Sequence, residues 1–145
     1  MVDALEDAWR VLDVGGVFVD LRPRPSRYPL DLVDAAETVT IGQVDTTGRA
    51  EDDQAADRAV ELVLERGWFL RDQGFEFPFE FWWDTVGDLE AFVQTRKVTT
   101  VSPSFVDLEK RYRECSGPAG RSIRLRSPRR VRLAVYRKRA RHAPP

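Results

Sequence analysis

The stretch Trp9–Pro23, WRVLDVGGVFVDLRP, predicts a helix, a turn and a strand in immediate succession. The helix is expected over about Asp3 to Leu12, because apolar residues recur there at helical spacing, namely Leu5, Ala8, Trp9 and Leu12. Gly15-Gly16 supplies the permissive backbone that ends a helix. Val17–Leu21 is a nearly continuous apolar run, which is typical of a strand buried on both faces in a parallel sheet.

Further strands and helices are expected along the chain from this unit. Val39–Val44 is rich in β-branched residues and predicts a strand, whereas Asp53–Arg66 has one apolar face and predicts a helix. In Gly74–Asp84, GFEFPFEFWWD, aromatic residues alternate with polar ones or proline, which indicates a strand. One set of aromatics is expected to form core against the two preceding helices, and it comprises Phe75, Phe77, Phe79, Phe81 and Trp83.

Two more helices are expected after the aromatic strand. The first begins near Thr85 and carries Leu89 and Phe92, and the second is capped by Ser102 or Ser104 and ends near Cys115. Together with the helices expected near the N-terminus and at Asp53–Arg66, the chain is expected to hold three or four helices.

The C-terminal segment Ser122–Arg137 alternates apolar and basic residues. This pattern predicts one strand or a hairpin broken at Ser127-Pro128. The fold class is therefore α/β (or α+β), with a small mixed sheet and three or four helices. Residues 1–145 are expected to form a single domain, in which residues 139–145 are a frayed tail.

Charge is distributed unevenly along the chain. The net charge is -1, but residues 111–145 hold 12 basic residues and one acidic residue, whereas residues 1–110 carry a charge of -12. Such polarity can serve a nucleic-acid contact, or the basic end can lie against the acidic body of the same fold. The acidic N-terminus and the lack of a long apolar run predict a cytoplasmic protein with no membrane contact.

Few residues are suited to catalysis or metal binding. His142 is the only histidine and lies at the C-terminal end, so neither a histidine metal cluster nor a histidine-based nucleophile system is expected. Cys115 is the only cysteine and is interpreted as a packed or incidental residue. Glu51, Asp52 and Asp53 precede or begin a helix, where acidic residues complement the helix dipole. We therefore assign no catalytic residue and no metal ligand.

Ends of strands offer candidates for a substrate-side rim. In open α/β sheets, ligands bind beyond the carboxyl ends of the strands. After the first strand this rule selects Arg22, Arg24 and Tyr28, and after the aromatic strand it selects Trp82, Trp83 and Asp84. The arginines could hold an anionic group. The alternative is that all six are ordinary structural or loop residues.

Three segments near the N-terminus resemble class I S-adenosylmethionine-dependent methyltransferases, namely Trp9–Leu12, Gly15-Gly16 and Val17–Pro23. They resemble the family's fifth-strand region, and the remainder resembles the C-terminal half of such a Rossmann-like enzyme. The resemblance implies a truncated or split member, inactive alone, that supplies structural and substrate-side elements. No cofactor-binding residue can be assigned, so S-adenosylmethionine would bind only if a missing N-terminal half completed the site.

The partners expected from this reading depend on the open edge of the sheet. Without the neighbouring strands of the parent architecture, Val17–Leu21 would leave one edge unpaired, which favours a homodimer or a partner chain. The alternative function is a non-enzymatic binding or interaction module that uses the basic C-terminal strands, with nucleic acid as a possible partner.

Overall fold

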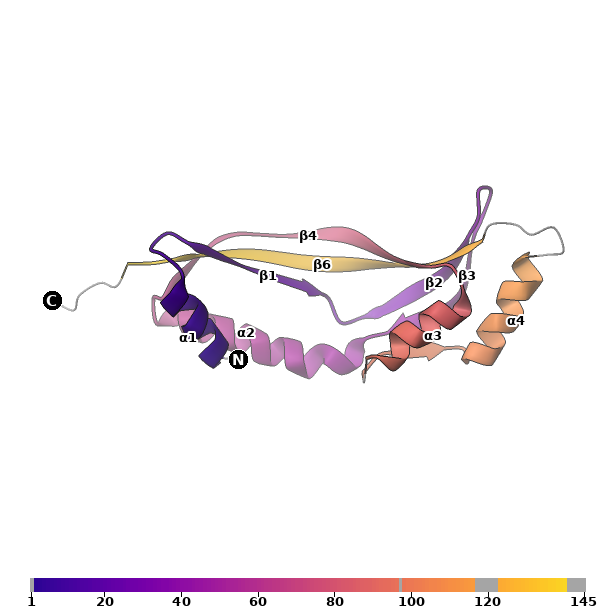
Figure 1. The fold of residues 1–145 in the computed structure, drawn as a ribbon, viewed down its shortest axis with the longest axis horizontal. Coiled ribbons are helices and arrows are strands. Elements are labelled where there is room, and N and C mark those ends of the chain that lie inside the picture. The colour runs from indigo at the N-terminus through magenta and orange to yellow at the C-terminus, as the bar shows by residue number, and fades with distance from the viewer. Residues whose placement is uncertain (1, 97, 117–122, 141–145) are drawn as a thin grey trace. The chain divides into compact units, whose positions relative to one another are not determined.

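Four α-helices and six β-strands make up the described residues, 2–96, 98–116 and 123–140, of a computed structural model (Figure 1). In chain order they are α1 (Val2–Val11), β1 (Val17–Pro23), β2 (Arg27–Val33), β3 (Thr38–Asp45), the 3-10 helix η1 (Thr47–Arg49), α2 (Ala50–Glu65), β4 (Phe69–Trp83), α3 (Val86–Gln94), β5 (Thr100–Ser102), α4 (Phe105–Ser116) and β6 (Arg124–Lys138). The strands form an antiparallel sheet, so of the two expected classes the α+β fold is confirmed. None of the described helices has the length and apolar character needed to cross a membrane.

The chain divides into two compact units. The first unit holds residues 2–24, 50–77 and 130–140, and the second holds residues 25–49, 78–96, 98–116 and 123–129. The long strands β4 and β6 each contribute one part to each unit.

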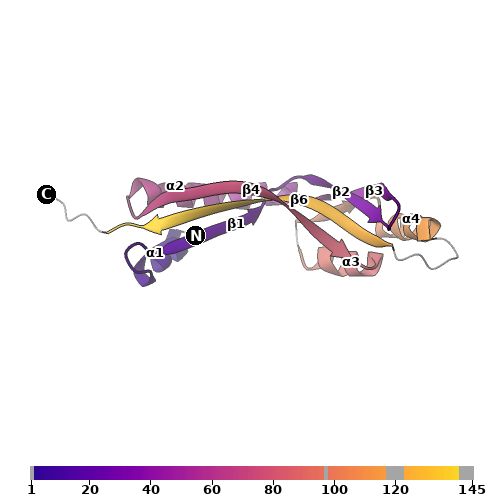
Figure 2. The same ribbon diagram turned by 90° about the horizontal axis from the view of Figure 1, so that it is seen from above.

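In the first unit, β6 lies between β1 and β4, and α1 and α2 cover one face of these strands (Figures 1 and 2). The core on the covered face consists of Val60, Val63, Phe69, Ala134 and Tyr136. Leu5 and Trp9 of α1, and Leu12 directly after it, pack against this core, so the helical spacing at the N-terminus is confirmed.

The prediction that Val17–Leu21 is buried on both faces is wrong. Along β1, Phe18, Asp20 and Arg22 are partly buried, whereas Val17, Val19 and Leu21 are exposed. The physical reason is the architecture: helices cover only one face of an antiparallel sheet, so successive side chains alternate between the core and solvent.

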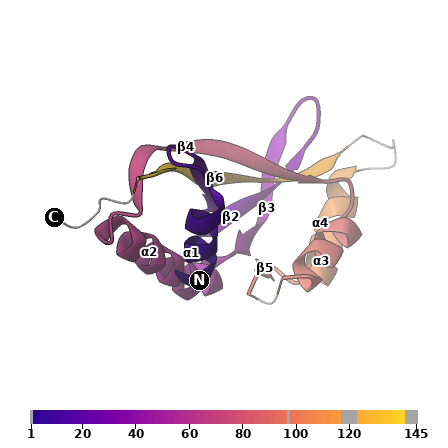
Figure 3. The ribbon, with the colours of Figure 1, turned by 60° about the vertical axis from the view of Figure 1, so that its left-hand side comes forward.

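In the second unit, β3 lies between β2 and β5, and β2 also pairs with the first part of β6. The pairing of β2 with β3 shifts after Leu30, which leaves Ile41 as the extra residue of a β-bulge. Arg111 Nη1 donates a hydrogen bond to the carbonyl oxygen of Ile41 at 2.6 Å. Figure 3 shows α3 and α4 side by side, and their buried residues Leu89 and Leu108 join the core of this unit.

The aromatic strand forms as β4, but the prediction for its aromatic face is only partly right. Phe81 and Trp83 pack against Phe92, with ring centroids 5.3 and 5.2 Å away. Phe92 belongs to α3, so the helix that covers these rings follows the strand instead of preceding it. Phe75 and Phe79 are exposed, because the aromatic alternation extends beyond the part of the strand that a helix covers.

The C-terminal segment forms one continuous strand, so the alternative of a hairpin broken at Ser127-Pro128 is wrong. Pro128 lies between the stretch of β6 that pairs with β2 and the stretch that pairs with β1. Proline has no N–H to donate, and it is tolerated at this position because Pro128 is paired with neither β1 nor β2. The predicted frayed tail begins at Arg139, whose N–H donates a hydrogen bond to the Trp68 carbonyl oxygen at 2.9 Å. Residues 141–145 of the tail, which include His142, and Ser122 lie outside the described residues.

Candidate interaction edge of the first unit

The backbone of β1 directs every second pair of N–H and C=O groups away from β6. Lys138 N donates to the Gly16 carbonyl oxygen at 2.8 Å, and Arg24 N donates to the Arg130 carbonyl oxygen at 2.9 Å. Hydrogen-bonded and non-hydrogen-bonded pairs alternate in an antiparallel ladder, so the even-numbered residues of β1 bond to β6. Val17, Val19 and Leu21 therefore present their N–H and C=O groups at the outer edge, where no described strand pairs with them.

The same three residues expose apolar side chains on the face that the helices leave open. Val17, Val19 and Leu21 are 42%, 53% and 55% exposed. We call these three residues the outer strip. A signal in the sequence could have revealed it: Asp20 inside an apolar run indicates that alternate residues of the run face different environments.

On the opposite face of β1, a cluster of ion pairs joins the strand to α2. Arg22 Nε and Nη2 donate to the two carboxylate oxygens of Asp20 at 2.8 and 2.6 Å. Arg22 Nη2 also donates to Asp57 of α2 at 2.7 Å, and Arg132 of β6 donates to the same carboxylate. The cluster accounts for the partial burial of charged residues at Asp20 and Arg22.

The pKa values of Asp57, Arg22 and Arg132 shift toward the charged forms. Partial burial raises the pKa of Asp57, but hydrogen bonds from Arg132 and Arg22 outweigh this and hold it below its ordinary value. Burial lowers the pKa of Arg22, but its hydrogen bonds to Asp20 and Asp57 outweigh that effect and raise it. The shifts favour the charged forms of Asp57, Arg22 and Arg132, and the cluster stabilises the attachment of α2 to the strands.

We expect Asp57→Asn to lower the free energy of unfolding at pH 7 by about 0.5–1 kcal/mol, because the Asp57 side chain is partly exposed and its pairs are screened by solvent. A carboxylate whose pKa is lowered on folding stabilises the protein above its unfolded pKa of about 3.9. This contribution is lost as the pH falls through the folded pKa, so the difference between variant and wild type should shrink as the pH is lowered below the unfolded pKa. Urea unfolding of variant and wild type at several pH values measures this difference. The control is Asp7→Asn, which removes an exposed ion pair with Arg10. A difference that is independent of pH would contradict the prediction.

The six residues expected at a substrate-side rim are divided between the two units. Arg22 and Arg24 belong to the first unit, and Tyr28, Trp82, Trp83 and Asp84 belong to the second. As substrate-side residues they stay a prediction.

Each of these residues also makes structural contacts, as the alternative interpretation requires. Arg24 pairs with Glu76 at 2.7 Å, and Trp82 Nε1 donates to Glu80 at 3.1 Å. Trp83 is core, Tyr28 is buried, and Asp84 accepts a hydrogen bond from Arg124 at 2.6 Å.

Many arginines of the basic strand β6 are paired with acidic residues of the same unit. Arg126 contacts Asp31 at 3.0 Å and Glu80 at 3.4 Å, and Arg137 contacts Asp72 at 2.5 Å. These pairs favour the interpretation in which the basic end lies against the acidic body of the fold. A nucleic-acid contact by this strand stays a prediction, to which the paired arginines lend little support.

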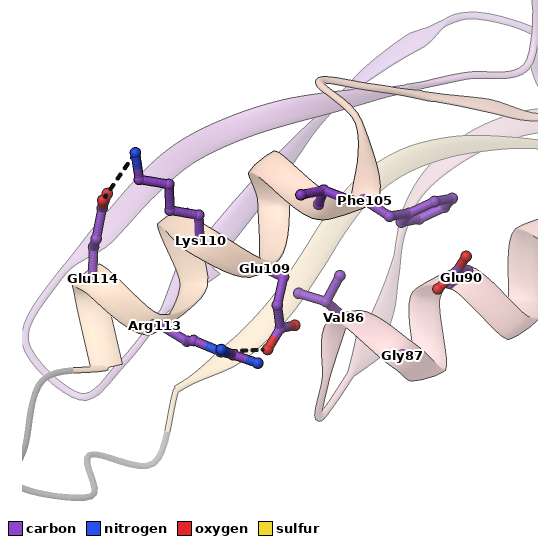
Figure 4. A pocket seen from close by; sticks show the side chains of 9 residues that line it. Val86, Gly87, Glu90, Phe105, Glu109, Lys110, Arg113 and Glu114 are labelled. Atoms are coloured by element: carbon purple, nitrogen blue, oxygen red, sulfur yellow. Dashed lines mark hydrogen bonds and ion pairs between the residues drawn. The ribbon is translucent and has the colours of Figure 1, made fainter.

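The second unit has a concave surface between two of its helices. A groove of about 650 Å³ lies between α3 and α4 (Figure 4). Its charged residues pair along α4, Arg113 with Glu109 at 2.9 Å and Lys110 with Glu114 at 4.0 Å. Cys115 is exposed, and no group of metal-ligating side chains occurs in the described part of the chain.

Comparison with protein-family profiles, curated proteins and solved structures finds no match to this chain. The fold and the open edge of β1 are therefore the features from which a function can be argued. They define an α+β protein in which strand β1 has one edge that no described strand pairs with.

Proposed function

We propose that this protein is a protein-interaction module, in which the first unit pairs β1 with β1 of a second copy of the chain. The observation that carries the proposal is the coincidence of two features on the same residues. Val17, Val19 and Leu21 present both unpaired backbone groups and exposed apolar side chains. Unpaired edges with apolar side chains are templates for pairing with another strand.

The other outer strand of this unit, β4, lacks this combination. Edge strands are protected from pairing by charged residues, proline and glycine. In β4 such residues follow one another on alternate positions, Asp72, Gly74, Glu76 and Pro78. β1 carries no such residue between Val17 and Leu21 on its outer face, so β1 is the edge suited to pairing.

The backbone pattern restricts how two copies of β1 can pair. In an antiparallel pair about a two-fold axis, the odd-numbered residues must occupy the hydrogen-bonded positions. An axis at Val19 opposes Val19 to its copy and Val17 to Leu21, so all three residues exchange hydrogen bonds. An axis at Asp20 would instead oppose two carboxylates and would place Pro23, which has no N–H, in a hydrogen-bonded position. We therefore place the axis at Val19.

The methyltransferase interpretation stays a prediction that rests on the sequence of Trp9–Pro23. It implies that the strand corresponding to β1 has neighbours on both sides. In the first unit β1 pairs with β6 alone among the described strands. The interaction module therefore accounts better for the geometry.

Sedimentation equilibrium tests the proposed dimer. Because a pair of short strands is smaller than a standard interface, we expect a dissociation constant of about 100 µM. Val19→Lys should weaken the dimer at least about tenfold, because it places two like charges directly opposite each other at the axis. The matched control is Leu70→Lys in β4, where an equally exposed apolar side chain lies outside the outer strip.

A disulfide at the axis provides a second measurement. Opposed residues in a hydrogen-bonded pair have Cα atoms about 5.5 Å apart, which suits a disulfide. In a background in which Cys115 is replaced by serine, Val19→Cys should oxidise to a covalent dimer, whereas Leu70→Cys should not. A monomer at all concentrations, or equal cross-linking of the two variants, would overturn the proposal.

A further inference from the structure

Arg129 of the second unit is a buried cation with unused hydrogen-bond donors. Its side chain extends from β6, the residue is only 7% exposed, and neither Nε nor Nη2 has a hydrogen-bond partner among the described residues. Buried polar groups are nearly always paired, and an unpaired charged donor is costly. Arg126, three residues earlier on the other face of β6, also has a buried Nε without a described partner, but its Nη2 and Nη1 form ion pairs with Asp31 and Glu80. Arg129 differs because none of the described carboxylates pairs with it.

The surroundings of Arg129 are aromatic and positively charged. The rings of Phe81 and Tyr28 lie 4.7 and 5.2 Å from its guanidinium carbon, and they attract the charge without offering a carboxylate. Burial lowers the pKa of Arg129, the interaction with Tyr28 partly opposes this, and the positive charges of Arg96 and Arg49 lower it further. An anion at this place would offset both the burial and the repulsion.

The chain itself shows what this edge of an arginine binds. Nε and Nη2 are the donors with which Arg22 holds the two oxygens of Asp20, at 2.8 and 2.6 Å. This bidentate geometry matches carboxylate and phosphate groups, which present two oxygens side by side. Arg129 has the same pair of donors without an acceptor.

A second unused polar group lies on the same face of β6. Ser127 is fully buried, and its hydroxyl has no hydrogen-bond partner. Residues two apart in a strand lie on the same face, about 6.6 Å from each other. The hydroxyl can thus donate to a ligand held at Arg129, or to a water that accompanies it.

We propose that the second unit contains a binding site for a small oxyanion, a carboxylate or phosphate group, held by the Nε and Nη2 donors of Arg129 with Ser127 nearby. The ligand replaces the missing acceptor and brings a negative charge among Arg129, Arg96 and Arg49. Because both donors are screened from solvent, the ligand enters when the surrounding side chains move. The site does not depend on the pairing of β1.

The experiment is a titration of the wild-type protein with inorganic phosphate and, separately, with acetate, at constant ionic strength. The readout is the NMR signal of the Arg129 Nε–H group, assigned by its loss in Arg129→Lys. We expect a saturable shift at concentrations of up to about 50 mM. A shift with phosphate alone indicates a phosphate-type ligand, and a shift with acetate indicates a carboxylate.

Variants distinguish this site from general attraction of anions. Calorimetry should show binding weakened at least about tenfold in Arg129→Met, because two charge-assisted hydrogen bonds are lost. Arg130→Met removes an adjacent but exposed arginine and should bind as the wild type does. The proposal is overturned if neither anion shifts the Arg129 signal saturably, or if Arg129→Met binds as tightly as Arg130→Met. The NMR arm uses the wild-type protein, so it decides the matter even if Arg129→Met fails to fold.

Discussion

Replacing Phe69 with alanine should lower the free energy of unfolding by about 3–5 kcal/mol, the largest effect that we expect from a single substitution. Phe69 is 1% exposed, and its ring meets the ring of Phe18 edge to face with centroids 4.8 Å apart. It also belongs to the core that joins α2 to β6. Removing the ring leaves a cavity between β1, β6 and α2. The loss of folding free energy therefore includes the lost transfer of the ring out of water and the cost of the cavity that remains.

The matched control is Leu70→Ala at the next position of β4. Leu70 is 50% exposed and points away from this core, so its loss should cost about 0.5 kcal/mol. Urea unfolding followed by circular dichroism measures both variants, and thermal unfolding should place Phe69→Ala about 10 °C or more below wild type. Equal effects of the two substitutions would show that Phe69 does not hold the core of the first unit.

The helices and most strands could be predicted from the sequence, because their signals are local. Helical spacing located α1 and α2, and the aromatic alternation located β4. The environment of each face could not be predicted in the same way. Val17–Leu21 contains one polar residue, so periodicity alone could not show that helices cover only the side of Phe18 and Asp20.

The candidate sites were harder to predict because they depend on contacts between residues distant in the sequence. Arg22 was expected to be free for a substrate, but Asp57, 35 positions away, pairs with it. In the sequence, Arg129 is one more basic residue of a strand in which apolar and basic residues alternate. Its significance arises from Phe81 and Tyr28, which the antiparallel sheet brings to the same face of the second unit.

Gly42→Ala should destabilise the second unit by about 1–3 kcal/mol, because β3 and the segment after β5 approach each other too closely for a side chain. A Cβ atom at Gly42 would lie 2.5 Å from the backbone oxygen of Ser102 and 3.0 Å from Cδ of Pro103. It would also meet Leu108 of α4 at 3.2 Å, and Leu108 is fully buried. Backbone and core would have to shift together, since the Ser102 oxygen belongs to the backbone, Pro103 Cδ belongs to a ring, and the Leu108 side chain is fully buried.

The same substitution at Gly74 separates this steric effect from the general cost or gain of replacing glycine in a strand. A Cβ atom at Gly74 would meet only the Leu133 carbonyl oxygen, at an ordinary contact distance of 3.7 Å. Gly74→Ala should therefore leave stability unchanged or raise it by about 0.5 kcal/mol, since alanine reduces the entropy of the unfolded chain. Urea unfolding of the two variants gives the comparison. If Gly42→Ala unfolds at the same urea concentration as Gly74→Ala, the close approach of β3 to Ser102 is relieved without cost, and the packing argument for Gly42 is wrong.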